Sequence, residues 1–102
     1  MVNMEITLLE DKAEEATRLL SAMANTKRLL ILCSLLGDEL SVGELSRKVD
    51  LPQSPLSQHL GRLRALGLVS ARRQGQQVLY ALASREVEQV LETLYGIYCA
   101  PD

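Results

Sequence analysis

The spacing of apolar residues predicts two helices in the first third of the chain. Over residues 11–23 they recur at helical intervals, and acidic residues occupy the first turn, where the helix dipole favours negative charge. A second helix is predicted to begin after Asn25 or Thr26, either of which can cap it, and to end at Leu36 before Gly37. Apolar residues cover nearly every side of this second helix, so we expect it to be the buried central helix of the fold.

The middle of the chain predicts two short helices joined by a tight turn. The stretch SVGE, beginning at Ser41, is a capping box that opens a helix over SVGELSRKV, and Pro52 breaks this helix. Ser54 and Pro55 then read as the N-cap and first position of a helix that continues to residue 66. Two short helices in this order are the signature of a helix-turn-helix.

After residue 67 the apolar spacing changes from helical to alternating. LVSARRQ and QVLYAL read as two strands of a hairpin around Gly75, where a positive φ is wanted. Ser84 then caps a last helix. Its apolar positions are Val87, Val90, Leu91, Leu94, Tyr95 and Tyr98. The order helix-helix-helix-helix-hairpin-helix predicts a mainly α fold with a small β-hairpin wing, a single winged helix-turn-helix domain over residues 1–102.

Length and composition bound the class of protein. A chain of 102 residues has room for one domain with one modest core and for no separate catalytic lobe. No apolar run approaches the ~18 residues that span a bilayer, and the N-terminal residues lack the basic and apolar segments of a secretory signal. We therefore expect a cytoplasmic protein without a membrane partner, in a compartment where thiols are normally reduced.

The charge of the chain is unevenly distributed. The formal net charge is −2, which by itself argues against a nucleic-acid partner. However, residues 40–80 contain six basic and two acidic residues, whereas residues 1–39 and 81–102 each carry a net charge of −3. A basic centre between acidic ends suits DNA binding, because phosphates are contacted locally and not by the average charge.

The predicted helix over residues 55–66 has an apolar side and a polar side. At about 100° per residue, three leucines share one side, and short or polar residues occupy the other. The leucines are Leu56, Leu60 and Leu63, and the opposite side carries Ser54, Gln58, Gly61, Arg62 and Ala65. Such a flat polar face is narrow enough to enter the major groove of DNA.

Individual side chains of this region match known base and phosphate contacts. Gln58 can pair bidentately with adenine, and Ser54 or Ser57 can donate or accept hydrogen bonds at several base edges. Arg72 and Arg73, near the tip of the predicted hairpin, suit flanking phosphates or the minor groove. The predicted DNA-binding residues are Gln53, Ser54, Ser57, Gln58, Arg62, Arg72 and Arg73.

The remaining candidates for chemistry are one histidine and two cysteines. His59 lies at the edge of the leucine stripe, where a buried or half-buried structural imidazole is favoured over a base contact or a metal ligand. Cys33 is set among leucines and Cys99 lies near the C-terminus, so the residues alone leave open whether they are core filler or one site. The chain has no Cys-x-x-Cys and no base near either cysteine, so we expect neither an enzyme nor a catalytic residue.

Three stretches of the chain resemble the ArsR/SmtB family of transcriptional repressors, over about residues 15–98. They are AMANTKRLLILCSLL, SVGELSRKVDLPQSPLSQHLGRLRALGLV and RRQGQQVLYAL. The resemblance implies a homodimer, built from the first and last helices, that binds an imperfect palindrome in double-stranded promoter DNA. It also implies that an inducer lowers the affinity for DNA.

The metal sites of this family do not match the chain. The arsenic-type site requires Cys-x-Cys before the DNA-reading helix, where this chain has ELSVGELSRK. The zinc-type site requires a histidine in the last helix, where SREVEQVLETLYGIYC has none. We therefore expect no metal site and no cofactor.

Cys33 and Cys99 resemble instead a dithiol branch of the family that responds to persulfides and redox change. This branch includes the biofilm-growth, sulfide-quinone-reductase and HlyU-like regulators. The resemblance implies that a reactive sulfur species or another oxidant joins the two thiols within one chain. Soft thiolates also suit metal or metalloid ions, so a metal-sensing repressor and a peroxide sensor are the alternatives.

Overall fold

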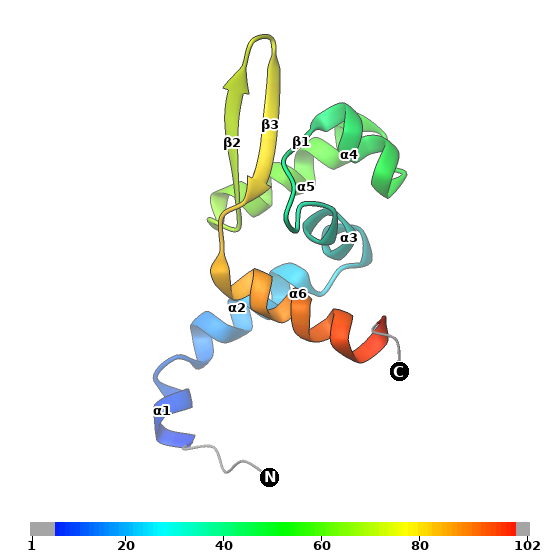
Figure 1. The fold of residues 1–102 in the computed structure, drawn as a ribbon. Helices are drawn as coiled ribbons and strands as arrows, with labels where there is room; N and C mark the ends of the chain where they lie inside the picture. The colour runs from blue at the N-terminus through cyan, green and yellow to red at the C-terminus, as the bar shows by residue number, and fades with distance from the viewer. Residues whose placement is uncertain (1–5, 100–102) are drawn as a thin grey trace.

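Six helices and a three-stranded sheet make up residues 6–99, the part of the chain that the computed structural model describes (Figure 1). The helices are α1 (Ile6–Glu10), α2 (Ala13–Met23), α3 (Thr26–Ser34), α4 (Val42–Val49), α5 (Gln53–Ala65) and α6 (Arg85–Tyr98). The strands are β1 (Leu40–Ser41), β2 (Val69–Gln74) and β3 (Gln77–Leu82). The α4–α5 pair and the β2–β3 hairpin confirm the predicted winged helix-turn-helix.

Two elements are additional to the predicted order. The helix α1 precedes the first predicted helix, and β1 pairs antiparallel with β3, with Leu40 opposite Tyr80 and Ser41 opposite Leu79. The sheet order is therefore β1-β3-β2, and β1 connects the wing to the body of the fold. A two-residue strand is too short to show the alternation of side chains from which strands are predicted.

The predicted caps of α3, α4 and α6 are present in the structure. The side chain of Asn25 accepts a hydrogen bond from the backbone N–H of Arg28 at 3.0 Å and caps α3. The capping box of α4 is complete, because Ser41 Oγ accepts from the N–H of Glu44 and the N–H of Ser41 donates to Glu44 Oε1. Ser84 caps α6. Each cap satisfies a backbone group that a helix end leaves without a partner.

The predicted start of α5 is wrong by two residues. The helix begins at Gln53, and Pro52, not Ser54, is in the N-cap position. The carbonyl of Pro52 accepts a hydrogen bond from the N–H of Leu56 at 3.2 Å, which brings Pro55 inside the first turn. A proline is tolerated there because the N–H groups of the first turn have no acceptor within the helix.

The predictions for α3 are correct in outline and wrong in two details. The helix ends at Ser34, not at Leu36. It packs against α2 and α4 and buries Leu32 completely, but Leu30 and Cys33 on its other side are exposed. The expectation that α3 is buried nearly all round is therefore wrong, because residues 6–99 leave part of that second side uncovered.

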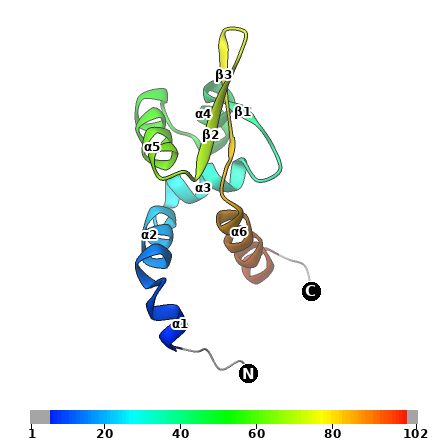
Figure 2. The same ribbon diagram turned by 90° about the vertical axis from the view of Figure 1, so that its left-hand side faces the viewer.

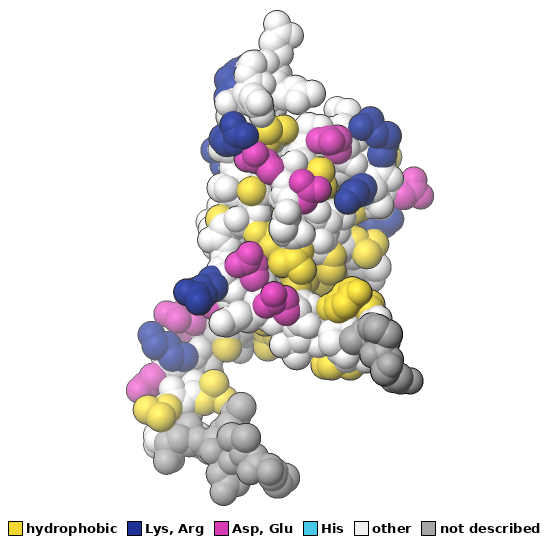
Figure 3. All heavy atoms as spheres, in the orientation of Figure 1, with side chains coloured by type: hydrophobic (Ala, Val, Ile, Leu, Met, Phe, Trp, Pro, Cys, Tyr) yellow, Lys and Arg dark blue, Asp and Glu magenta, His cyan; other side chains and the backbone are white. Residues whose placement is uncertain are grey.

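The molecule is elongated, with extents of 50 × 35 × 21 Å. The wing projects from one end, α1 and α2 extend from the other, and α6 crosses the body between them (Figures 1 and 2). Large apolar side chains are exposed on these three helices: Ile6, Leu8, Leu9, Leu20, Tyr95, Ile97 and Tyr98. Figure 3 shows hydrophobic side chains gathered over α6, whereas Lys and Arg side chains lie over the wing, α4 and α2. None of the helices in residues 6–99 is long and apolar enough to cross a membrane.

Candidate DNA-binding surface and thiol pair

The helix α5 has the two sides that its sequence predicts. Leu56, Leu60 and Leu63 are each at most 1% exposed and lie in the core. The side chains on the other side are all exposed: Gln53, Ser54, Ser57, Gln58 and Arg62. We call these five residues the reading surface. They present amide, hydroxyl and guanidinium groups that can bond to base edges and phosphates.

The turn between α4 and α5 is fixed by hydrogen bonds. Asp50 closes α4 in a left-handed conformation, with φ of 53°, and the hydroxyl of Ser46 donates to the carbonyl of Leu51. From α3, Lys27 Nζ donates to the carbonyl oxygen of Val49 at 2.9 Å. The reading surface is therefore attached through this turn to the helix that carries Cys33.

The two wing arginines lie on opposite faces of the hairpin. The hairpin turns at Gly75, whose φ is +64°, as required at the first position of a type II′ turn. Successive residues of a strand point to opposite sides, so Arg73 shares a face with the buried Val69, and Arg72 lies on the other face. The two side chains are therefore not equivalent.

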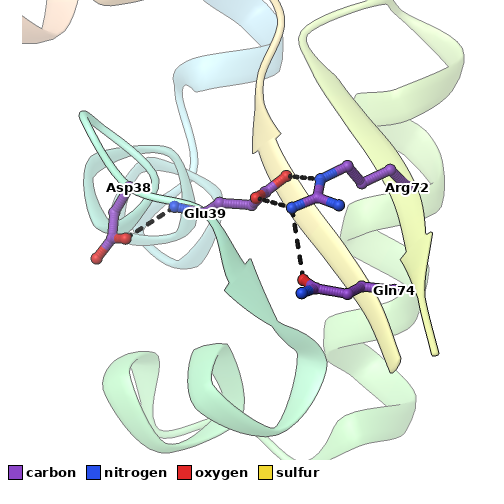
Figure 4. A network of polar contacts seen from close by, with 4 residues as sticks. All are labelled: Asp38, Glu39, Arg72 and Gln74. Carbon is purple, nitrogen blue, oxygen red and sulfur yellow. Dashed lines mark hydrogen bonds and ion pairs between the residues drawn. The ribbon is translucent and has the colours of Figure 1, made fainter. Parts of the chain in front are cut away.

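The guanidinium of Arg72 is bound by a carboxylate of its own chain (Figure 4). Its Nε and Nη2 donate to the two carboxylate oxygens of Glu39 at 2.6 and 2.7 Å, and Nη2 also donates to Gln74 Oε1 at 3.4 Å. The hydrogen bond from Arg72 lowers the pKa of Glu39, and Glu39 raises the pKa of Arg72. Sequence reasoning missed this pair, because no local pattern relates residues so far apart in the chain.

His59 lies half-buried beside the reading surface, as expected for a structural imidazole. Burial lowers its pKa, and the positive charges of Arg28 and Arg62 lower it further. The neutral form is therefore favoured near neutral pH. A neutral imidazole adds no positive charge beside the reading surface.

The two cysteines are both exposed, and the charge of Cys99 influences the pKa of Cys33. Cys33 is on α3, and Cys99 directly follows α6, where its N–H donates to the carbonyl of Tyr95 at 2.8 Å. Partial burial raises the pKa of Cys33, and a negative charge on Cys99 raises it further. Such an influence places the two thiols in the same region of the molecule. The alternative that both cysteines fill the core is thus not supported.

The described residues offer no cluster of the kind that holds a metal ion. In residues 6–99, no group of three or more histidine, cysteine, aspartate or glutamate side chains could hold one.

A helix-turn-helix with an exposed polar second helix and a β-hairpin wing defines a winged-helix DNA-binding regulator. The chain belongs to the bacterial regulatory protein family named arsR, whose sequence profile matches residues 25–71. It is 51% identical over 96 residues to the transcriptional activator HlyU of Vibrio cholerae serotype O1, an alignment that covers 94% of this chain and 89% of HlyU.

Solved structures of related proteins share the whole fold. Reduced HlyU from Vibrio cholerae N16961 superimposes with a TM-score of 0.86 at 52% identity, covering 90% of this chain and 97% of that one. The transcriptional repressor BigR from Xylella fastidiosa gives 0.90 at 38% identity, covering 96% and 100%. A homodimeric winged helix-turn-helix domain from Mycobacterium bovis gives 0.72 at 27% identity, covering 95% and 89%. Proteins of this family are transcriptional regulators and not enzymes.

Proposed function

We propose that this protein is a dimeric transcriptional repressor whose binding to promoter DNA is switched by reversible joining of Cys33 and Cys99. Reactive sulfur species such as polysulfides are the proposed inducers. The observation that carries the proposal is the exposure of two thiols, from distant parts of the chain, one of which influences the pKa of the other, in a member of a DNA-binding regulator family. A relative that is 52% identical has been described in a reduced form, which supports a redox change as the switch.

The proposed dimer uses the helices that carry exposed apolar side chains. Ile6, Leu8 and Leu20 on α1 and α2, with Tyr95 and Ile97 on α6, would lose contact with water at such an interface. A relative with the same fold is described as homodimeric. Two copies of α5 spaced by one turn of DNA, ~34–36 Å, would read the two halves of an imperfect palindrome.

In the proposed complex the reading surface enters the major groove. Gln58 pairs with an adenine, Ser54 and Ser57 contact other base edges, and Gln53 and Arg62 contact bases or phosphates. Arg73 and Arg72 on the wing supply contacts to flanking phosphates or the minor groove. A contact from Arg72 to DNA requires its guanidinium to leave Glu39.

The proposed switch is a two-step transfer of sulfur. A thiolate takes one sulfur atom from a polysulfide, becomes a persulfide and releases the shortened polysulfide. The second thiolate attacks the Sγ atom of the first cysteine, forms the disulfide and expels the added outer sulfur as hydrosulfide. The protein thiols lose two protons and two electrons, and the polysulfide is reduced.

The order of the two steps follows from the environment of Cys33. Its raised pKa leaves less thiolate at neutral pH, so we assign the first attack to Cys99 and the second to Cys33. A direct disulfide needs the Cα atoms within about 7 Å. Where the thiols are held farther apart, an additional sulfur atom closes the gap, which favours polysulfides over peroxide.

The test combines mass spectrometry with DNA binding. Protein treated with polysulfide, peroxide or diamide is measured intact, and its affinity for promoter DNA is measured in parallel. We expect polysulfide to remove two hydrogens and add zero or more sulfur atoms within one chain, and to release the DNA. A bridge between two subunits contradicts the proposal. Release of DNA by stoichiometric Zn(II), Cd(II) or As(III) in reducing buffer would indicate a metal sensor instead.

A further inference from the structure

The Glu39–Arg72 pair joins two segments that are separated by a strand. Glu39 directly precedes β1, Arg72 lies in β2, and β3 runs between them in the sheet. The arginine side chain extends across β3 to reach the carboxylate (Figure 4). The pair is bidentate, with both oxygens of Glu39 occupied by one guanidinium.

This pair is open to solvent. The side chain of Arg72 is 55% exposed and that of Glu39 is 33% exposed. An ion pair so exposed contributes little to stability, because water and salt screen it. It can therefore be exchanged for another partner without disturbing the fold.

A DNA phosphate has the features that Glu39 presents to Arg72. Both are anions with two oxygen atoms spaced to accept parallel hydrogen bonds from a guanidinium. In contrast to Arg72, Arg73 has no hydrogen-bond or ion-pair partner in residues 6–99. One wing arginine is thus available to DNA, and the other is already occupied by a carboxylate.

We propose that Glu39 competes with DNA phosphate for Arg72 and thereby lowers the affinity of the wing for duplex DNA. The proposal rests on the DNA binding proposed above. In the wild-type complex Arg72 contacts a phosphate in only a fraction of the molecules, because Glu39 holds it in the rest. Removing the carboxylate makes the contact available in all of them.

A purely structural role for the pair predicts the opposite sign. If Glu39 served to hold the hairpin in a DNA-binding position, loss of its charge would weaken DNA binding. Under competition, Glu39→Gln strengthens binding, and the gain depends on Arg72. The sign of the change therefore separates the two roles.

Asp38 offers a matched control. It is an exposed acid next to Glu39, and its Oδ1 accepts a hydrogen bond from the N–H of Glu39 at 2.8 Å. In Asp38→Asn the amide oxygen still accepts this bond. The substitution therefore removes one negative charge at nearly the same place and leaves the Glu39–Arg72 pair intact.

The experiment measures the fluorescence anisotropy of a labelled mixed-sequence duplex. A length of about 30 base pairs accommodates the two α5 helices of a dimer, one DNA turn apart. The proteins are wild type, Glu39→Gln, Arg72→Ala, the double variant and Asp38→Asn, each checked for an unchanged unfolding temperature. Mixed sequence suffices, because phosphate contacts carry no base information.

We expect Glu39→Gln to bind roughly two- to fivefold more tightly and to steepen the slope of log K against log salt by up to about 0.9, the value for one added phosphate contact. The double variant should lose this gain, and Asp38→Asn should show little of it. Equal or weaker binding by Glu39→Gln, or a gain that survives in the double variant, overturns the proposal. If wild type binds no duplex at all, the proposed DNA binding itself fails.

Discussion

The reading surface and the thiol pair are built in opposite ways. The leucines on the inner side of α5 are buried, and hydrogen bonds from side chains to backbone carbonyls fix the turn before α5. By contrast, Cys33 and Cys99 are exposed, and α6 presents unburied tyrosines. The part proposed to contact DNA is thus preformed within one chain, whereas the part proposed to react is open to reagents and to a second copy.

The helix α3 connects these two regions. In its first turn, Lys27 donates a hydrogen bond to the carbonyl of Val49 at the end of α4, and its last turn carries Cys33. A bond between Cys33 and Cys99 would link α3 to the end of α6, on the proposed dimer interface. We therefore expect regulation to move intact reading helices relative to each other and not to unfold them.

The largest effect should come from removing one thiol. Cys33→Ser and Cys99→Ser are each expected to bind DNA like wild type and to lose the response to polysulfide completely, because a bridge needs both sulfur atoms. DNA affinity with and without polysulfide measures this. Since Cys33 is exposed, its replacement should change stability by only about 0.5 kcal/mol. A single variant that still releases DNA on treatment would contradict the dithiol switch.

A leucine beneath the reading surface should matter most for stability. Leu60→Ala is expected to lower the free energy of unfolding by about 2–5 kcal/mol, because the side chain is 1% exposed and leaves a cavity. Leu36→Ala removes the same atoms at an exposed position and should cost much less. Urea unfolding of both variants tests whether the reading region is as tightly packed as described.

On the reading surface itself, Gln58→Ala should reduce specificity. The expected loss is about 1–3 kcal/mol of specific binding, with relaxed preference at one operator position, because a bidentate contact to adenine is lost. Binding to operator variants and to random duplex measures the two components separately. An equal loss on both would show that Gln58 does not read a base.

The wing should affect all DNA alike. Arg72→Ala and Arg73→Ala are expected to weaken binding to every sequence and to reduce the salt slope by up to about 0.9 per lost phosphate contact. The loss should be larger for Arg73, because Glu39 already occupies Arg72. An unchanged slope in the double variant would rule out wing contacts with DNA.

The smallest predicted effect is a shift in thiol titration. In Cys99→Ser the pKa of Cys33 should fall towards its ordinary value, because one of the two causes that raise it is gone, while burial, the larger cause, remains. The rate of Cys33 alkylation by iodoacetamide should then rise at lower pH than in wild type. Identical pH profiles would mean that the two thiols do not influence each other.

The sequence predicted those features that depend on neighbouring residues. The leucine side of α5, the capping box at Ser41 and the wing turn at Gly75 all follow local rules, and the structure confirms them. The exposure of Cys33 was missed, because a run of leucines does not reveal which side of a helix remains uncovered. The proximity of Cys33 to Cys99 followed only from a family resemblance, since it depends on how α3 and α6 pack.

The carboxylate beside the wing has a consequence for how long the protein stays on DNA of the wrong sequence. A genome offers on the order of 10⁶–10⁹ non-specific sites, and these sequester a regulator in proportion to its sequence-independent affinity. An internal anion that occupies Arg72 lowers that affinity without touching the groups that read bases. The operator loses the same factor, because a phosphate contact carries no base information, so the preference for the operator is kept while each stay on other DNA is shortened.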